Sequence, residues 1–261
     1  MTSGTGSLLE TRLTVSYEGR GAVLRDLELQ IAPAELLGLA GQSGSGKSTL
    51  ALALMGLLDA RNTEVTGTIR FRGRELTRLT EKQWRSIRGR EMAFVFQSAI
   101  ASLTPTMRLG SQIREAWEVH SREPKRWRSE AGAALEAVGL PSDDRFLRLF
   151  PRELSVGMAQ RFLTAMAVLH RPALLIADEP TSALDVITQS ELLKLFTRLN
   201  ASHGTAILLI THDLATAASF CHRIAVLNSG VIVEAGEPRT LLHDPRDAHT
   251  RRLVDAIVRW G

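Results

Sequence analysis

The chain has 261 residues, of which 44% are hydrophobic and 23% charged, a composition typical of globular proteins. Lys and Arg number 32 and Asp and Glu 28, so the formal net charge is only +4. The basic residues are spread along the chain, which argues against a nucleic-acid-binding stripe. The single cysteine excludes an internal disulfide and a cysteine-based metal cluster, and it suits a reducing cytoplasm. No apolar run approaches the roughly 20 residues of a membrane span, and the N-terminus lacks the pattern of a secretory signal.

The N-terminal part has the pattern of β-strands. The first few residues are rich in Ser, Gly and Thr, which predicts a frayed end. Leu13, Val15 and Tyr17 then alternate with polar residues, as half-buried strands do, and residues 27–31 and 65–71 repeat this alternation. This part of the chain therefore predicts a small antiparallel β layer.

Wholly apolar strands and helical segments alternate over the rest of the chain. The predicted strands are residues 36–40, 94–96, 173–177 and 205–210, and the predicted helical regions are 47–58, 109–152 (broken at Pro141 and Pro151), 159–169 and 188–200. Trp117, Leu135 and Val138 are predicted to be buried. Strands without polar alternation are expected where helices cover both faces of a parallel sheet. We therefore predict an α/β protein with one domain over 1–261, a helical insertion at about 98–160 and a helical tail at about 238–261.

The stretch GQSGSGKS, at residues 41–48, follows a predicted strand and opens a predicted helix. Its glycines allow the backbone to curl so that successive N–H groups converge on phosphate oxygens. Lys47 can reach the β- and γ-phosphates, and the Ser48 hydroxyl can hold Mg²⁺. The helix also turns its positive end toward the anion. A chance glycine-rich turn is the alternative, but the strand before and the helix after favour a P-loop NTPase core that binds ATP.

Two acids, Asp178 and Glu179, end the apolar strand at 173–177. The carboxyl ends of strands in open α/β sheets are where ligands bind. Asp178 is therefore predicted to fix Mg²⁺ through its water shell, and Glu179 to polarise the attacking water. By itself an acidic junction between a strand and a turn is common, so this prediction depends on the phosphate loop upstream.

Gln97 and His212 also follow predicted strands. A lone Gln there is usually a loop residue, and a lone His is usually a structural hydrogen-bonding group. A functional role is favoured for both residues because four strand ends are expected to meet at one edge of the sheet. These strand ends carry the phosphate loop, Gln97, Asp178 and His212.

Taken in chain order, these motifs resemble those of the ATP-binding cassette (ABC) transporter ATPases. Tyr17 stands where that family has its adenine-stacking aromatic residue, although a core aromatic is the alternative. LSVGM at 154–158 stands at the family signature and SALD at 182–185 at the dimer-contact loop. Gln97 matches the loop that senses the transmembrane partner, and His212 the switch histidine. The resemblance implies an N-terminal antiparallel β subdomain and a helical subdomain that carries the signature.

The resemblance also implies the site residues. The implied nucleotide contacts are Tyr17, Gly41, Gln42, Ser43, Gly44, Ser45, Gly46, Lys47, Ser48, Thr49, Gln97, Ser155 and Gly157; the implied magnesium contacts are Ser48, Gln97 and Asp178; the implied catalytic residues are Glu179 and His212. The cofactors implied are ATP and Mg²⁺.

A head-to-tail dimer that sandwiches two ATP molecules is implied as well. In such a dimer Ser155 and the Gly157 backbone bind the γ-phosphate held by the other subunit. The family has two consecutive glycines in its signature, and here Val156 replaces the first. Because a β-branched residue resists positive φ and prevents close backbone approach, we expect the site completed by this signature to hydrolyse ATP more slowly.

Within the family, Met158 and the segment 173–195 are most similar to the oligopeptide, dipeptide and nickel uptake branch. Members of that branch work as two different ATPase subunits under two transmembrane permease subunits, with an extracytoplasmic substrate-binding protein. The expected function is therefore to power import of peptides or nickel chelates from the cytoplasmic face of the membrane, without nucleic acid. The alternatives are a soluble ABC ATPase acting on nucleic acid or ribosomes, or a catalytically weakened regulatory subunit.

Overall fold

The computed structural model of the protein describes residues 6–19 and 21–260, with side chains described as far as residue 256. The first five residues, where a frayed end is predicted, lie outside this range. The chain forms two compact units: Met1–Trp84 with Ala206–Gly261, and Arg85–Thr205. No helix in the described part of the chain is long and apolar enough to cross a membrane.

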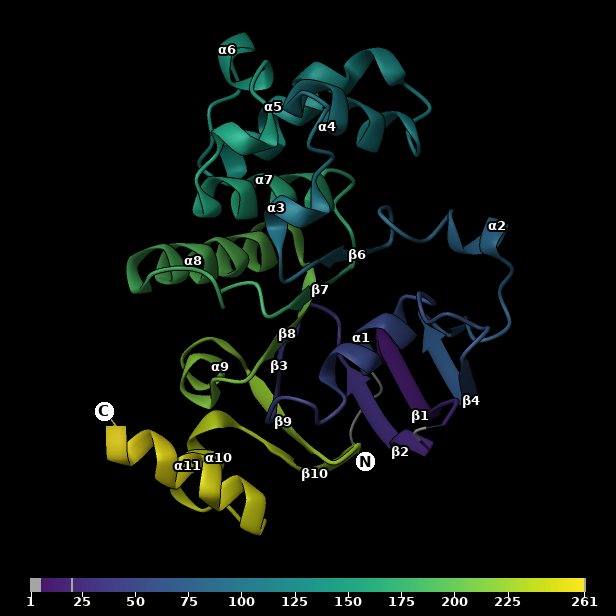
Figure 1. Ribbon diagram of the computed structural model, residues 1–261, viewed down its shortest axis with the longest axis vertical. Coiled ribbons are helices and arrows are strands. Elements are labelled where there is room, and N and C mark those ends of the chain that lie inside the picture. Colours follow the sequence, from purple (N-terminus) through teal and green to yellow (C-terminus); the bar gives the residue numbers. More distant parts are fainter. Residues whose placement is uncertain (1–5, 20, 261) are drawn as a thin grey trace. The chain divides into compact units, whose positions relative to one another are not determined.

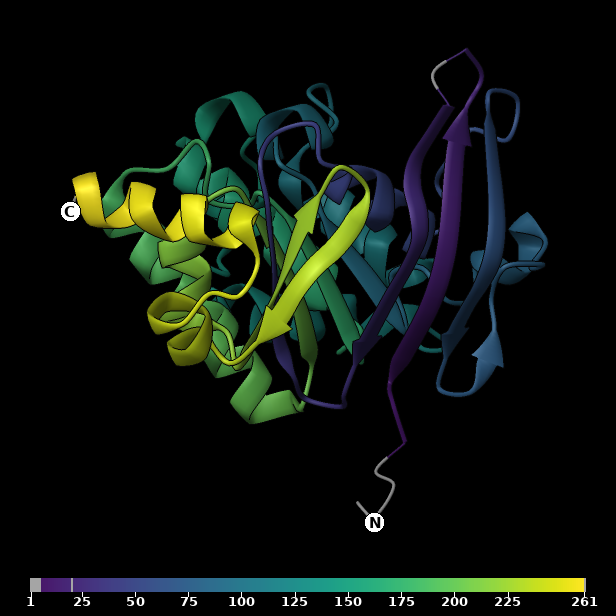
Figure 2. The same cartoon turned by 90° about the horizontal axis from the view of Figure 1, so that it is seen from below.

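The first unit contains a four-stranded antiparallel sheet (Figures 1 and 2). Its strands, in spatial order, are β2 (Gly21–Ile31), β1 (Leu9–Tyr17), β4 (Thr63–Phe71) and β5 (Arg74–Glu75). Leu13 and Val15 are buried while the residues beside them are less so, which is the period of two that predicted these strands. The predicted antiparallel β layer is confirmed.

A second group of strands in this unit has the order β10-β9-β3-β8. These are β3 (Leu36–Ala40), β8 (Ala206–Thr211), β9 (Arg223–Asn228) and β10 (Val231–Gly236). The strand β3 pairs in parallel with both β8 and β9, and all residues of β3 and β8 are buried. The β9–β10 hairpin has no counterpart among the predicted elements.

The helices of the first unit are α1 (Lys47–Leu54), α2 (Glu81–Trp84), α9 (Leu214–Phe220), α10 (Pro238–His243) and α11 (Ala248–Trp260). The helix α9 packs on β3 and β8, and the predicted helical tail is formed by α10 and α11. The helix α1 ends earlier than predicted because Gly56 has φ of +60°, where an added Cβ would enter the Trp84 ring.

The second unit contains the parallel strand pair β6 (Met92–Val95) and β7 (Leu174–Asp178) and most of the helices (Figure 1). The α-helices are α3 (Ala99–Ser102), α4 (Leu109–Glu118), α5 (Trp127–Ala137), α6 (Asp144–Leu147), α7 (Val156–Val168) and α8 (Val186–His203). Two short 3-10 turns, Pro124–Arg126 and Pro151–Glu153, lie among them.

The predicted burial of Leu135 and Val138 is confirmed, whereas the prediction for Trp117 is wrong. Trp117 is only half-buried, and its indole Nε1 donates a hydrogen bond to the Glu123 carbonyl at 3.1 Å. The ring stacks on His170 at a centroid distance of 4.8 Å.

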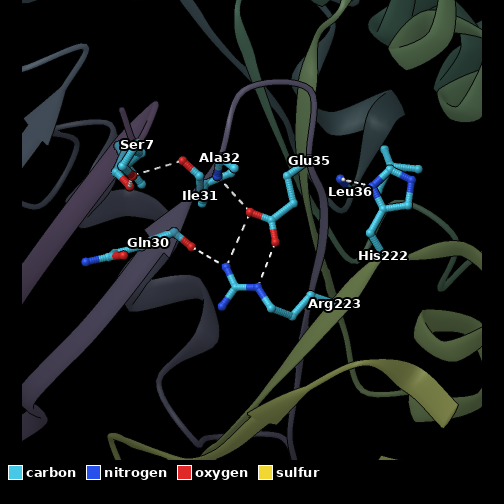
Figure 3. Close-up of polar contacts among 9 residues, drawn as sticks. Ser7, Gln30, Ile31, Ala32, Glu35, Leu36, His222 and Arg223 are labelled. Atoms are coloured by element: carbon cyan, nitrogen blue, oxygen red, sulfur yellow. Dashed lines mark hydrogen bonds and ion pairs between the residues drawn. The ribbon is translucent and has the colours of Figure 1, made fainter. Parts of the chain in front are cut away.

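A cluster of polar contacts fixes the start of β3 against the start of β9 (Figure 3). Arg223 Nε lies 2.7 Å from Glu35 Oε1, and Glu35 Oε2 accepts a hydrogen bond from the Ala32 amide at 2.7 Å. Beside this pair, the Leu36 amide donates to His222 Nδ1 at 3.2 Å. These contacts lie at the amino ends of two parallel strands and so fix the register in which β3 pairs with β9. The phosphate loop follows the opposite, carboxyl end of β3.

Candidate functional site

The predicted phosphate loop joins β3 to α1 in the first unit. Gly44 and Gly46 have φ of +80° and +108°, which a residue with a side chain rarely adopts. Lys47 is 5% exposed, and its Nζ donates to the carbonyl oxygens of Gly41 and Gln42 at 2.8 and 2.9 Å. The loop thus curls around a buried ammonium group at a helix N-terminus, an arrangement that suits a phosphate chain.

Strand β9 and the turn after it support this loop. A Cβ added to Gly41 would collide with the carbonyl oxygen of Leu227. The amide of Gly230, in the β9–β10 turn, donates to the Ser45 carbonyl at 3.0 Å. The sequence reasoning missed these supporting residues; the dipeptide Ser229-Gly230, a hairpin turn signal, was the one clue available.

Tyr17 ends β1, where it pairs with Gly21 on β2 and with Thr63 on β4. It is half-buried. The neighbouring part of β2 contacts the phosphate loop, because a Cβ on Gly46 would lie 2.7 Å from Leu24 Cδ2. Tyr17 therefore lies at the end of a strand pair that packs on the loop, and its stacking role stays a prediction.

His212 follows β8 at the same edge as the phosphate loop. Ala40 pairs with Thr211, so Gly41 and His212 are the next residues on two neighbouring parallel strands. His212 is exposed. Asp213 caps α9 by accepting hydrogen bonds from the amides of residues 215 and 216 at 2.9 and 3.2 Å. This cap holds the backbone directly after His212 in place.

Gln97 and Glu179 meet in the second unit. Val95 pairs with Ala177 in the β6–β7 ladder, so both residues follow paired strand ends. Gln97 Nε2 lies 3.2 Å from Glu179 Oε2 and 3.5 Å from Ser182 Oγ. The sequence predicts separate roles for these two residues, and their contact is seen only in the structure.

Glu179 has a left-handed backbone conformation, with φ of +45°. Such a conformation costs about 1–3 kcal/mol in a residue with a side chain, and it is concentrated at functional sites. The Ser182 hydroxyl donates to the Glu179 carbonyl at 3.1 Å, which closes the turn behind it. The left-handed conformation turns the chain sharply after β7 and directs the Glu179 carboxylate toward Gln97.

Asp178 is the last residue of β7 and is 8% exposed. The described residues contain no group of three or more His, Cys, Asp or Glu side chains that could hold a metal ion. Mg²⁺ bound with a nucleotide takes most of its ligands from phosphate oxygens and water. The predicted ligands, the Ser48 hydroxyl, the Gln97 amide oxygen and the Asp178 carboxylate, are hard oxygen donors of the kind that Mg²⁺ prefers, and their joint binding of the ion stays a prediction.

The signature stands at the start of α7. Ser155 Oγ accepts a hydrogen bond from the Met158 amide at 3.2 Å, so Ser155 is the helix cap. Val156 is the first helical residue, and neither Val156 nor Gly157 has a positive φ. The expectation that Val156 strains this backbone is therefore wrong, because an α-helical residue can be β-branched. Its effect on close approach of a nucleotide stays a prediction.

A strand, a glycine-rich loop and a helix with a buried lysine, together with a carboxylate at a strand end, are the features of a P-loop ATPase. The family model described as ABC transporter matches residues 24–182. The chain belongs to the ABC transporter family, and it is an ATP-binding, ATP-hydrolysing subunit of that class.

Relatives of this chain include peptide transport proteins. The dipeptide transport ATP-binding protein DppD of Escherichia coli (strain K12) is 39% identical over 96% of this chain and 78% of its own length. The oligopeptide transport ATP-binding protein OppD of Salmonella typhimurium (strain LT2) is 39% identical over 93% of this chain and 72% of its own. The predicted resemblance to the oligopeptide and dipeptide branch is confirmed.

Solved structures confirm the fold. A dimeric ATP-binding cassette in a post-hydrolysis state with ADP and Pi has a TM-score of 0.76 at 26% identity, over 88% of this chain and 99% of its own. CbiO1 from Clostridium perfringens, part of the transporter complex CbiONQ, has a TM-score of 0.78 over 97% of this chain and 94% of its own. Its identity of 22% makes this second likeness one of fold alone.

Proposed function

We propose that this subunit hydrolyses MgATP through Glu179 and that the energy drives peptide uptake through membrane-embedded partners. The observation that supports the catalytic assignment best is the Gln97–Glu179 contact at the ends of two paired parallel strands, with Glu179 in a strained left-handed conformation. Strain of this kind persists only where the surrounding structure holds it, and here Ser182 does so.

Each residue has a defined task in the proposed mechanism. The backbone amides of residues 41–48 and the Lys47 ammonium group hold the phosphates, with Tyr17 against the adenine ring. The predicted magnesium ligands would hold Mg²⁺, which would supply positive charge to offset that of the phosphates. Glu179 accepts a proton from the attacking water, while Gln97 orients that carboxylate. His212 donates a hydrogen bond to the γ-phosphate as charge develops on it.

The cargo and partners follow from the relatives. The names of DppD and OppD support dipeptides or oligopeptides as cargo more directly than nickel chelates. The dimeric state of one related cassette supports a dimer, which we propose to be head-to-tail. We propose that residues 1–261 work as one ATPase domain in a dimer with a second, different ATPase subunit. In this proposal the dimer lies peripherally on the cytoplasmic face of two permease subunits fed by an extracytoplasmic binding protein.

The proposed catalytic role is tested with the Glu179→Gln variant and its parent. The parent chain, assembled with the partner subunits, should release phosphate from MgATP. Glu179→Gln should bind ATP as tightly but hydrolyse it at least about 100-fold more slowly, as removal of a general base does. Normal turnover in this variant would show that Glu179 is not the base, and no phosphate release by the parent would refute the ATPase assignment itself.

A further inference from the structure

The amino-terminal ends of α7 and α8 lie against each other in the second unit. Helix α7 begins in the signature, and α8 begins directly after the SALD loop. Asp185 caps α8, because its Oδ1 accepts hydrogen bonds from the Ile187 and Thr188 amides at 3.1 and 3.0 Å. These hydrogen bonds, with the one from the Thr188 side chain, hold the pKa of Asp185 below its ordinary value. The cap is therefore ionised at neutral pH.

Thr188 contacts both the signature at the start of α7 and the SALD loop before α8. Its hydroxyl donates to Asp185 Oδ2 at 2.7 Å. On its other branch, the methyl carbon Cγ2 lies only 2.7 Å from the position that a Cβ on Gly157 would take. One side chain therefore binds the dimer-contact turn with its hydroxyl group and packs on the signature with its methyl group.

The same contact explains which signature glycine this chain needs. Val156 is 42% exposed, so its side chain points away from the core of the unit. At Gly157 a side chain has no room, because the Thr188 methyl group fills it. The substitution at position 156 is thus accommodated, while position 157 is restricted by α8.

We propose that Thr188 is a positioning residue that couples the signature turn to the SALD turn, so that both partner-facing turns move as one. This inference rests on the proposed ATPase function, in which those turns complete the ATP site of the second subunit. Thr188 does not itself touch nucleotide in this proposal. It acts through Asp185 on one side and through Gly157 on the other.

A double-mutant cycle tests the methyl contact. Gly157→Ala should lower the kcat for ATP hydrolysis of the assembled transporter by about tenfold or more, because the new Cβ displaces the signature turn. Thr188→Ser removes the methyl group and keeps the hydroxyl, so Gly157→Ala/Thr188→Ser should recover most of that loss. If the double variant is as slow as Gly157→Ala alone, the coupling through Thr188 is refuted.

Thr188→Val tests the hydroxyl contact, since it keeps the shape but cannot donate to Asp185. We expect a kcat reduction of about three- to tenfold with little change in KM for ATP, because the residue acts on the completed site and not on ATP capture. Thr197→Val, whose hydroxyl donates to Leu193 O on the exposed side of the same helix, is the matched control and should keep full activity. Equal effects of the two valine variants would overturn the proposal.

Two further measurements separate the possible failures. Chemical unfolding of each free variant shows whether the chain still folds, and only variants that unfold cooperatively enter the cycle. The parent and Glu179→Gln are measured in parallel. A parent that hydrolyses ATP and a cycle without coupling would reject the role of Thr188 alone, whereas an inactive parent would reject the proposed function.

Discussion

At the scale of single residues, Lys47 is the side chain most tightly integrated into the phosphate loop. Its ammonium group is buried and hydrogen-bonded to two carbonyl oxygens of the loop. A buried cation is stabilised further when an anion binds beside it. The loop is therefore preorganised for phosphate, with the charge already in place.

Lys47→Ala should weaken ATP binding strongly. In the parent, ATP at about 100 times its Kd should add about 2.7 kcal/mol to the free energy of unfolding. The variant should lose most of this gain at the same ATP concentration, as measured by the shift in thermal unfolding midpoint. Lys82→Ala, at an exposed lysine on α2, is the control and should keep the full shift. An unchanged shift in Lys47→Ala would exclude the loop as the phosphate site.

At the scale of elements, the β9–β10 hairpin supports the phosphate loop from the side. Gly230 donates its amide to Ser45 O and accepts from the Arg25 amide, both at 3.0 Å. The turn thus connects the loop to β2, the strand that pairs with the Tyr17 end of β1. Two parts of the predicted nucleotide site are linked by one hairpin.

Gly230→Ala should disturb this link. Gly230 has φ of +83°, and an added Cβ would collide with the Val23 carbonyl oxygen. Gly73→Ala is a matched control, since Gly73 has φ of +75° with open space around it. We expect a loss of about 1 kcal/mol in unfolding free energy for Gly73→Ala. For Gly230→Ala we expect about 1–3 kcal/mol more from overpacking, together with weaker ATP binding, both measured by urea unfolding with and without ATP. Equal losses in the two variants would show that the hairpin does not support the loop.

The junction of α4, α7 and the turn before β6 should make stability sensitive to acid. His120 and His170 lie edge to face there, 5.4 Å apart. Burial, and then repulsion from the second imidazole, lowers the pKa of His120. Burial is also the main cause that lowers the pKa of His170, although a hydrogen bond to the Ala116 carbonyl opposes it. Their folded pKa values are thus below those in the unfolded chain. The unfolded state consequently binds more protons as the pH falls through the ordinary imidazole value of about 6.5.

The free energy of unfolding should therefore have its full value above that pH and should decrease below it. Urea unfolding at pH 7.5 and pH 5.5 measures the difference. His170→Gln should reduce the pH dependence, whereas His203→Gln, at an exposed position at the end of α8, should leave it as in the parent. A parent whose stability is the same at both pH values would contradict this prediction.

At the scale of the whole molecule, the proposed function requires a second cassette. The signature and the SALD loop are on the surface: Val186 and Ile187, which follow SALD, are 83% and 74% exposed. Exposed aliphatic side chains next to a capped helix end favour contact with another protein surface. One related cassette of solved structure is dimeric.

ATP should drive this assembly when hydrolysis is blocked. Glu179→Gln mixed with its partner ATPase subunit should form a dimer in MgATP and separate when ATP is removed, as measured by analytical ultracentrifugation. The same mixture with Lys47→Ala in place of Glu179→Gln should stay largely dissociated, because nucleotide capture fails. Dimer formation that is independent of ATP would argue against the proposed cycle.

Local spacing in the sequence was sufficient for the phosphate loop, the acidic strand end and most of the strands. These features depend on residues that are close in sequence: glycines that permit positive φ at 44 and 46, a lysine at the helix start, and apolar runs such as 36–40. Backbone sterics and burial act over a few residues, so their pattern can be read before folding.

Tertiary structure alone decided the contacts between distant segments. The Gln97–Glu179 contact depends on the pairing of β6 with β7. The support of Ser45 depends on the β9–β10 hairpin, and the lack of room at Gly157 depends on a methyl group of α8. The sequence also could not show that Val156 takes a helical φ, because that depends on where α7 begins. Such contacts join residues far apart in the chain, and only the packing of complete elements determines which side chains meet.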